Sequence, residues 1–163
     1  MAGDPEDAHK LESALQQSSE LQAPVWMGEL GWWHCLNGDY QKSVDLLSAA
    51  VQQRPTDVNL WLRLSWAQIE IRRYGDALQT LNGGVYEQRM DPERAIVRAV
   101  ANWQAQEHNE AMRDFDIALG GQPEWENSSW VKALHSPLVA QSVQEMQAER
   151  ERQRQKAKVA ASR

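Results

Sequence analysis

Few residues in this chain have types and spacings that suggest chemistry of their own. His34 and Cys35 are adjacent, and a Cys–His pair is the arrangement that activates a thiol nucleophile. Both fall within an expected helix, where neighbouring side chains diverge by about 100 degrees and so do not face each other. We therefore interpret Cys35 as a small buried hydrophobic residue.

The remaining polar clusters suggest less. Residues 107–110, Glu-His-Asn-Glu, lie at an expected turn and lack further metal ligands. His9 and Glu12 fall one turn apart on an expected N-terminal helix and are interpreted as surface residues. The chain has no phosphate-binding glycine loop, paired-cysteine motif or His-Glu-x-x-His motif. We expect no catalytic residue, no metal and no cofactor, and hence no enzyme activity.

Composition and charge narrow the class of protein. The hydrophobic share of 42% is enough for a folded core. The formal charge of −6 argues against a domain that binds nucleic acid through its whole surface. No apolar run reaches the roughly 18 residues of a membrane-spanning helix, and the acidic N-terminus does not resemble a signal peptide. Cys35 is the single cysteine, which favours a reducing compartment, so we expect a cytoplasmic location.

Three consecutive segments, residues 24–57, 58–91 and 92–125, are each 34 residues long and align without gaps. The alignment brings small residues together at two positions and large apolar residues together at a third. These are Ser43, Ala77 and Ala111; Ala50, Gly84 and Ala118; and Leu47, Leu81 and Phe115. A fixed period in this range predicts an all-α stacked solenoid, whose units cannot bury their apolar faces alone.

Each repeat is predicted to form two antiparallel helices. The expected ranges are residues 25–37 and 40–53, then 59–72 and 75–82, then 93–106 and 109–119. Gly38 and Asp39 should form the first turn, and Pro55 should stop the second helix. The pair Gly120-Gly121 is expected to close the last repeat, although such glycines also occur where helices cross closely.

The flanking segments are predicted to be helical caps and a tail. Residues 1–23 form an expected N-terminal helix whose apolar stripe is Ala8, Leu11, Ala14 and Leu15. Residues 126–146 contain the expected C-terminal capping helix, which starts at Ser136-Pro137 and ends its apolar stripe at Met146. Residues 147–163 are charged and partly basic. They are interpreted as a solvated helical tail or a linker, with a contact to RNA or an anionic membrane as the alternative.

The repeats resemble the tetratricopeptide repeat family, which prefers Trp, Leu and Gly at positions 4, 7 and 8 of each repeat. Later preferences are Tyr at position 11, Ala at 20, an aromatic residue at 24, Ala at 27 and Pro at 32. Matching residues are Trp61, Leu30, Leu64, Gly31, Ala77, Ala111, Phe115, Ala50, Ala118, Pro55 and Pro123. Departures are His34, Gln68 and Asn102 at position 11, Arg98 at position 7 and Arg89 at position 32.

The resemblance implies a right-handed superhelix whose concave groove is lined by the first helix of each repeat. Family members mostly hold peptides or helices of other proteins. In this frame the groove positions 5, 9 and 12 are Gly28, Trp32 and Cys35; Leu62, Trp66 and Ile69; and Ile96, Val100 and Trp103.

The leading hypothesis is therefore a protein-interaction scaffold that binds a helix or apolar peptide of a protein partner, with Trp32, Trp66 and Trp103 as anchors. Arg63, Glu70 and Glu93 lie near this stripe and would set orientation.

Two alternatives remain open. The groove is filled by the N- or C-terminal helix, which gives a structural or regulatory module that self-associates as a homo-oligomer or serves a larger protein. Alternatively the repeats coil tightly and leave no usable groove.

Binding of a chaperone C-terminal carboxylate is not expected, because the family's clamp positions here are Gly28, Trp32, Arg63, Glu93 and Val97, of which only Arg63 could serve.

Overall fold

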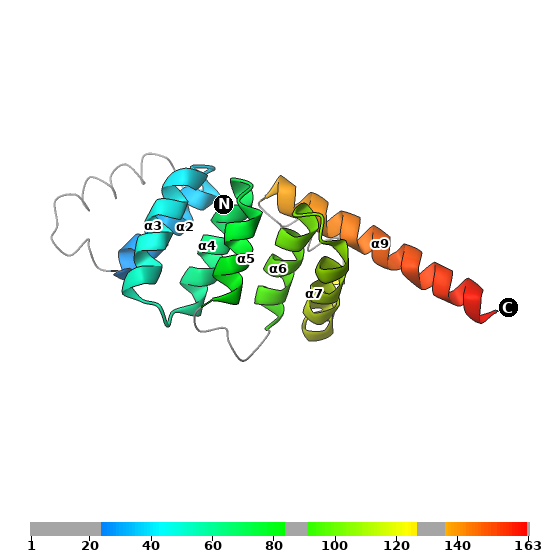
Figure 1. The fold of residues 1–163 in the computed structure, drawn as a ribbon. Helices are drawn as coiled ribbons and strands as arrows, with labels where there is room; N and C mark the ends of the chain where they lie inside the picture. Colours follow the sequence, from blue (N-terminus) through cyan, green and yellow to red (C-terminus); the bar gives the residue numbers. More distant parts are fainter. Residues whose placement is uncertain (1–23, 84–90, 127–135, 163) are drawn as a thin grey trace. The chain divides into compact units, whose positions relative to one another are not determined.

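A computed structural model describes residues 24–83, 91–126 and 136–162 (Figure 1). The predicted helix over residues 1–23, together with Gly84 and Trp130, lies outside the described residues. The chain divides into two compact units, residues 1–88 and residues 89–163.

The first unit contains four described helices, α2 (Pro24–Leu36), α3 (Tyr40–Gln53), α4 (Val58–Glu70) and α5 (Tyr74–Asn82). Each helix packs against the next one along the chain, α2 on α3, α3 on α4 and α4 on α5. Figure 1 shows α2 and α3 as one helical hairpin and α4 and α5 as another.

The second unit contains α6 (Pro92–Gln104), α7 (His108–Gly121), the short 3₁₀ helix η3 (Pro123–Glu126) and α9 (Pro137–Ala161). α6 packs along α7, and α9 contacts both of them. The prediction of an all-α helical repeat fold is confirmed. The six repeat helices begin and end within two residues of the expected ranges.

The 34-residue period is visible in the backbone of all three turns between paired helices. Gly38, Arg72 and Gln106 are one period apart and have φ of 84, 62 and 66 degrees, in the left-handed region. The N–H of the following residue bonds to a carbonyl five residues earlier, at 2.9 Å for Asp39 to His34, 2.8 Å for Arg73 to Gln68 and 2.9 Å for Glu107 to Asn102. Each turn therefore closes its first helix in the same way.

Three helices begin at side chains that cap free backbone N–H groups. The Asp57 carboxylate accepts from the Asn59 N–H across 3.1 Å, and the Asp91 carboxylate accepts from the Arg94 N–H across 2.7 Å. The Ser136 hydroxyl accepts from the Val139 N–H across 3.1 Å. Pro92 and Pro137 follow two of these caps at the first helical position, where no N–H is needed. The cap at Ser136 was predicted from the sequence, whereas those at Asp57 and Asp91 were not.

The aligned residues of the repeats form the core. Their side chains, where described, have no exposed surface; they are Ser43, Ala77, Ala111, Ala50, Ala118, Leu47, Leu81 and Phe115. Gly31 allows α2 to approach α3 closely, since a Cβ atom there would lie 2.8 Å from Leu47 Cγ and 3.2 Å from the Leu47 backbone nitrogen. A larger residue at position 31 would force the two helices apart.

The expected stop at Gly120-Gly121 is wrong, because α7 continues through Gly121 and the Gln122 N–H still bonds to the Ala118 carbonyl at 2.9 Å. A Cβ atom on Gly121 would lie 2.3 Å from Pro92 Cγ. The glycine therefore permits the end of α7 to pass beside the start of α6, which is the close crossing considered as the second interpretation.

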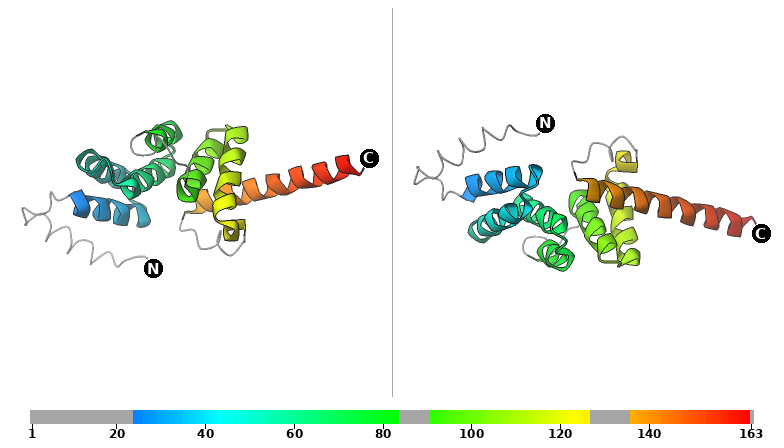
Figure 2. Two further views of the ribbon diagram at one scale, coloured as in Figure 1. Left: turned by 90° about the horizontal axis from the view of Figure 1, so that it is seen from below. Right: turned by 90° about the horizontal axis from the view of Figure 1, so that it is seen from above.

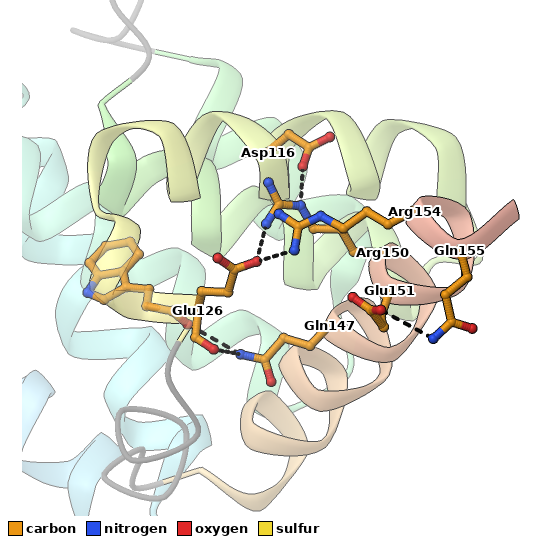
Figure 3. Close-up of polar contacts among 8 residues, drawn as sticks. Asp116, Glu126, Gln147, Arg150, Glu151, Arg154 and Gln155 are labelled. Carbon is orange, nitrogen blue, oxygen red and sulfur yellow. Dashed lines mark hydrogen bonds and ion pairs between the residues drawn. The ribbon is translucent and has the colours of Figure 1, made fainter. Parts of the chain in front are cut away.

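Helix α9 is held first by apolar and then by polar contacts. Val139, Val143 and Met146 are buried, and both views of Figure 2 show α9 continuing as one helix beyond them. Beyond Met146, the guanidinium of Arg150 donates to Asp116 at 2.8 Å and to Glu126 at 2.6 Å (Figure 3). The guanidinium of Arg154 also donates to Glu126, at 2.8 Å.

The side-chain amide of Gln147 completes this attachment, since it donates to the carbonyl oxygens of Trp125 and Glu126 at 3.3 and 3.4 Å (Figure 3). Residues 147–154 are therefore anchored rather than frayed, and residues 155–161 continue as an exposed helix. Three of the tail's cations are paired with carboxylates of the same unit: Arg150 and Arg154 with residues outside α9, and Arg152 with Glu149 of α9 itself.

Candidate protein-binding face

The candidate face of the first unit begins on α2, which carries the groove positions Gly28, Trp32 and Cys35. Gly28 and Cys35 are buried, whereas Trp32 is partly exposed and packs against the core of the unit. A Cβ atom on Gly28 would lie 2.4 Å from Leu60 Cδ2, so the glycine makes room for a side chain of α4. Of these three residues, Trp32 is the one that offers surface to a partner.

Arg63 on α4 is fixed between two residues of α2. Its guanidinium lies 5.7 Å from the centroid of the Trp32 ring, and its Nη1 donates to Glu29 Oε1 across 2.6 Å. The side chain of Arg63 is 26% exposed and that of Glu29 is 57% exposed, so each contact is worth about 1 kcal/mol or less. Together the contacts restrict the rotamers of both Arg63 and Trp32.

The groove positions of α4 are Leu62, Trp66 and Ile69. Ile69 is fully buried, whereas Leu62 and Trp66 are partly exposed, and Trp66 packs against the same core as Trp32. Trp61 lies on another side of α4, where its indole N–H donates to the Pro55 carbonyl at 2.8 Å. Trp61 is therefore a structural residue that ties the start of α4 to the preceding turn.

Cys35 sits beside the acidic end of α4. Burial raises the pKa of the Cys35 thiol to about 12; the negative charge of Glu70 adds to the shift, and a hydrogen bond with Ser43 opposes it. Burial, then the charges of Glu70 and Cys35, also raise the pKa of Tyr40. His34 is directed elsewhere, with Nδ1 3.3 Å from Asp39 Oδ2. The thiol stays protonated at neutral pH and is not set up as a nucleophile.

The remaining predicted site residues, Ile96, Val100 and Trp103, belong to the second unit. Ile96 and Val100 are buried. Trp103 faces α9, where its indole N–H donates to Glu145 Oε2 at 2.7 Å, and its ring lies edge-on to His108 at 4.4 Å. The hydrogen bonds from Trp103 and then Gln141 lower the pKa of the Glu145 carboxyl. In this unit α9, a helix of the same chain, contacts Trp103, the third tryptophan of the predicted groove.

The structure places seven of the predicted residues in the first unit, where Arg63 contacts Trp32, Glu70 lies near Cys35, and Trp32 and Trp66 pack on one core. The seven are Trp32, Cys35, Leu62, Arg63, Trp66, Ile69 and Glu70. Ile96, Val100 and Trp103 lie in the second unit. Sequence reasoning missed Glu29, although a signal existed. Glu29 and Arg63 occupy the same repeat position one period apart, so an acidic and a basic side chain on adjacent first helices could have been paired. The partner of Trp103, Glu145, had no comparable signal because it lies outside the repeats.

A shallow hollow of about 470 Å³ lies along the far end of α9, beside Arg152, Gln155, Lys156, Val159 and Ala160. All of its lining comes from one exposed helix, so it lacks the converging walls of a ligand site. Within the described parts of the chain, no group of three or more His, Cys, Asp or Glu side chains is placed to hold a metal ion.

Paired helices of constant period, repeated turn geometry and an aromatic face on first helices define the class of helical repeat proteins that bind other proteins. The family model of the tetratricopeptide repeat matches residues 36–101, from the end of α2 into α6. The chain therefore contains tetratricopeptide repeats over the matched residues. Searches of curated proteins and of solved structures gave no significant match. None of the helices in the described ranges is long and apolar enough to cross a membrane.

Proposed function

We propose that this protein-interaction module binds an amphipathic helix or apolar peptide of a partner on the face formed by Trp32, Arg63, Leu62 and Trp66. The observation that carries the proposal is the position of Arg63, held over the Trp32 ring and paired with Glu29. This arrangement presents an indole and a guanidinium on the surface in restricted conformations.

The chemistry of the face favours an apolar partner segment. Trp and Arg dominate interface hot spots, because each buries a large area and still offers hydrogen-bond donors. The two indoles already pack against the core of the unit, so little side-chain freedom is lost when a partner covers them. Because Glu29 balances the charge of Arg63, the face does not call for a strongly acidic ligand.

The same pairing supports the expectation that the chain does not bind a chaperone carboxylate. Arg63 would have to exchange Glu29 for the incoming carboxylate, and the other clamp positions of the first unit hold Gly28 and Trp32.

A selection of helical peptides tests the proposal. Amphipathic peptides displayed on phage would be selected on the wild-type chain, and their affinities measured against Trp66→Ala and Trp32→Ala. We expect each variant to lose at least about 30-fold in affinity, as for interface hot spots, while circular dichroism shows an unchanged helical content. Trp26→Ala is the matched control, since Trp26 lies on another side of α2 and should leave affinity unchanged.

The outcome that contradicts the proposal is a set of selected peptides whose affinity survives both substitutions. Loss of affinity in the Trp26→Ala control alone would move the binding face to the other side of α2.

The second candidate function is a structural or regulatory module whose binding positions are already occupied. The contact of Trp103 with Glu145 favours it for the second unit, because α9 covers a position that the family frame assigns to the groove. Self-association is tested by light scattering across a range of protein concentrations. A mass that rises with concentration, and that Trp32→Ala and Trp66→Ala restore to that of a monomer, would put a second copy on the proposed face.

A further inference from the structure

Helix α2 carries a second aromatic surface, apart from the candidate binding face. Trp26 is 50% exposed, Leu36 is 42% exposed and Trp33 is partly exposed. Trp26 and Trp33 are seven residues apart and so lie on the same side of the helix, about two turns from each other. We name this surface the outer α2 face. Two large indoles at the surface are unusual unless another element covers them.

The repeat register shows what the equivalent face of the second repeat contacts. Trp26 and Trp33 occupy positions 3 and 10 of the first repeat, and the same positions of the second repeat are Leu60 and Ala67. Leu60 is 3% exposed and Ala67 fully buried, and both belong to the core cluster formed with Leu47 and Ala50 of α3. In the second repeat this side of the first helix therefore docks on the helices that precede it.

From this register we propose that residues 1–23, which directly precede α2 in the same unit, dock on the outer α2 face. The sequence pattern of that segment includes an apolar stripe made of Ala8, Leu11, Ala14 and Leu15. The small side chains of this stripe complement the outer α2 face, because its alanines leave room for the bulky indoles of Trp26 and Trp33. α2 has 13 residues and spans about 20 Å, a length that 23 residues match with enough left for a connecting turn.

The proposal separates the tryptophans of α2 by role. Trp26 and Trp33 receive a segment of their own chain, whereas Trp32 stays available to a partner. It goes beyond the proposed function, and it stands whether or not a peptide binds at Trp32 and Trp66.

A double-mutant cycle in the full chain tests the docking. The variants are Trp26→Ala, Leu11→Glu and their combination, with thermal unfolding followed by circular dichroism. We expect each single variant to lower the midpoint and the combination to fall no lower than the worse single variant, because both remove the same contact. Ser13→Glu is the matched control. It adds the same charge about 200 degrees away from Leu11 on the expected helix and should leave the midpoint unchanged.

A local measurement keeps the proposal falsifiable if the thermal changes are small. Amide hydrogen exchange should show protection over residues 8–15 in the wild-type chain, reduced at least about 10-fold by Trp26→Ala. Exchange over residues 8–15 at the rate of an unfolded peptide would overturn the proposal, as would strictly additive effects in the cycle. A dimer by light scattering that Trp26→Ala converts to a monomer would also overturn it, because the outer α2 face would then bind a second copy.

Discussion

Arg98 on α6 and Asp114 on α7 form a two-pronged ion pair, in which Arg98 Nε donates to Asp114 Oδ2 at 2.7 Å and Arg98 Nη2 donates to Oδ1. Asn102 adds a third bond, from Nδ2 to the same Oδ2 at 2.9 Å. Asp114 is almost fully buried, so these donors take the place of water around its side chain. The second repeat has a neutral counterpart at the equivalent positions, where Thr80 donates to Gln68 at 2.9 Å.

We expect Asp114→Ala to lower the free energy of unfolding by about 3 to 5 kcal/mol, because it removes the carboxylate that pairs with Arg98 between α6 and α7. Urea unfolding followed by circular dichroism measures the loss. Arg98→Leu alone should cost a similar amount, since it leaves a buried carboxylate. The double variant should cost clearly less than the sum of the two, and full additivity would show that the pair is not coupled.

This pair also marks the limit of what the sequence could predict. Helix ranges and core positions followed from the 34-residue period, from punctuating residues such as Pro55 and Ser136-Pro137, and from the small residues aligned with Ala77. Position 11 looked like a set of departures, His34, Gln68 and Asn102. The structure shows that two of them serve polar contacts with the facing helix, which depend on residues 12 positions away. Local spacing does not reveal such pairings.

The candidate site was predictable to a similar extent. The sequence frame placed Trp32 and Trp66 at equivalent positions of two first helices, and both are partly exposed against one core. It could not foresee that Glu145 accepts the indole N–H of Trp103, because α9 is outside the repeat register and its docking depends on tertiary packing.

The left-handed turn residues Arg72 and Gln106 store conformational strain that Gly38 avoids. We expect Arg72→Gly and Gln106→Gly each to stabilise the chain by about 1 kcal/mol, since glycine adopts positive φ without a steric penalty. The melting midpoint should rise by about 2 to 4 °C. Arg73→Gly is the control one residue later, where φ is −87 degrees and glycine brings no relief. An equal gain from Arg73→Gly would contradict the explanation by strain.

Cys35 should be unreactive in the folded protein. With its pKa raised from 9.0 to about 12, the thiol at pH 8 holds roughly a thousandfold less thiolate than in the unfolded chain. Labelling with a chromogenic disulfide should therefore be much slower in buffer than in denaturant. Glu70→Gln removes one cause of the shift and should speed native labelling. Rapid labelling of the folded wild type would contradict the burial of Cys35.

The raised pKa of Cys35 also makes the stability of the fold depend on pH. Because the folded pKa of Cys35 is raised, its contribution to stability is present below pH 9.0 and is lost as the pH rises toward about 12. Cys35→Ala should remove this part of the alkaline destabilisation, which thermal unfolding at pH 8 and pH 10.5 would measure. An unchanged difference between the two pH values in Cys35→Ala would assign the destabilisation to other groups.

Glu126 anchors the second half of α9, since it accepts bonds from both Arg150 and Arg154. These contacts are exposed, so Glu126→Gln should change global stability by less than about 1 kcal/mol. Hydrogen exchange should instead show faster opening over residues 150–158 while residues 139–146, held by buried Val143 and Met146, stay protected. Added salt should produce the same local effect in the wild type, because exposed ion pairs are screened.

Glu149→Gln serves as the control, since Glu149 pairs with Arg152 within α9 and does not tie the helix to its neighbours. If both variants opened α9 equally, the anchoring of α9 by Glu126 would be contradicted.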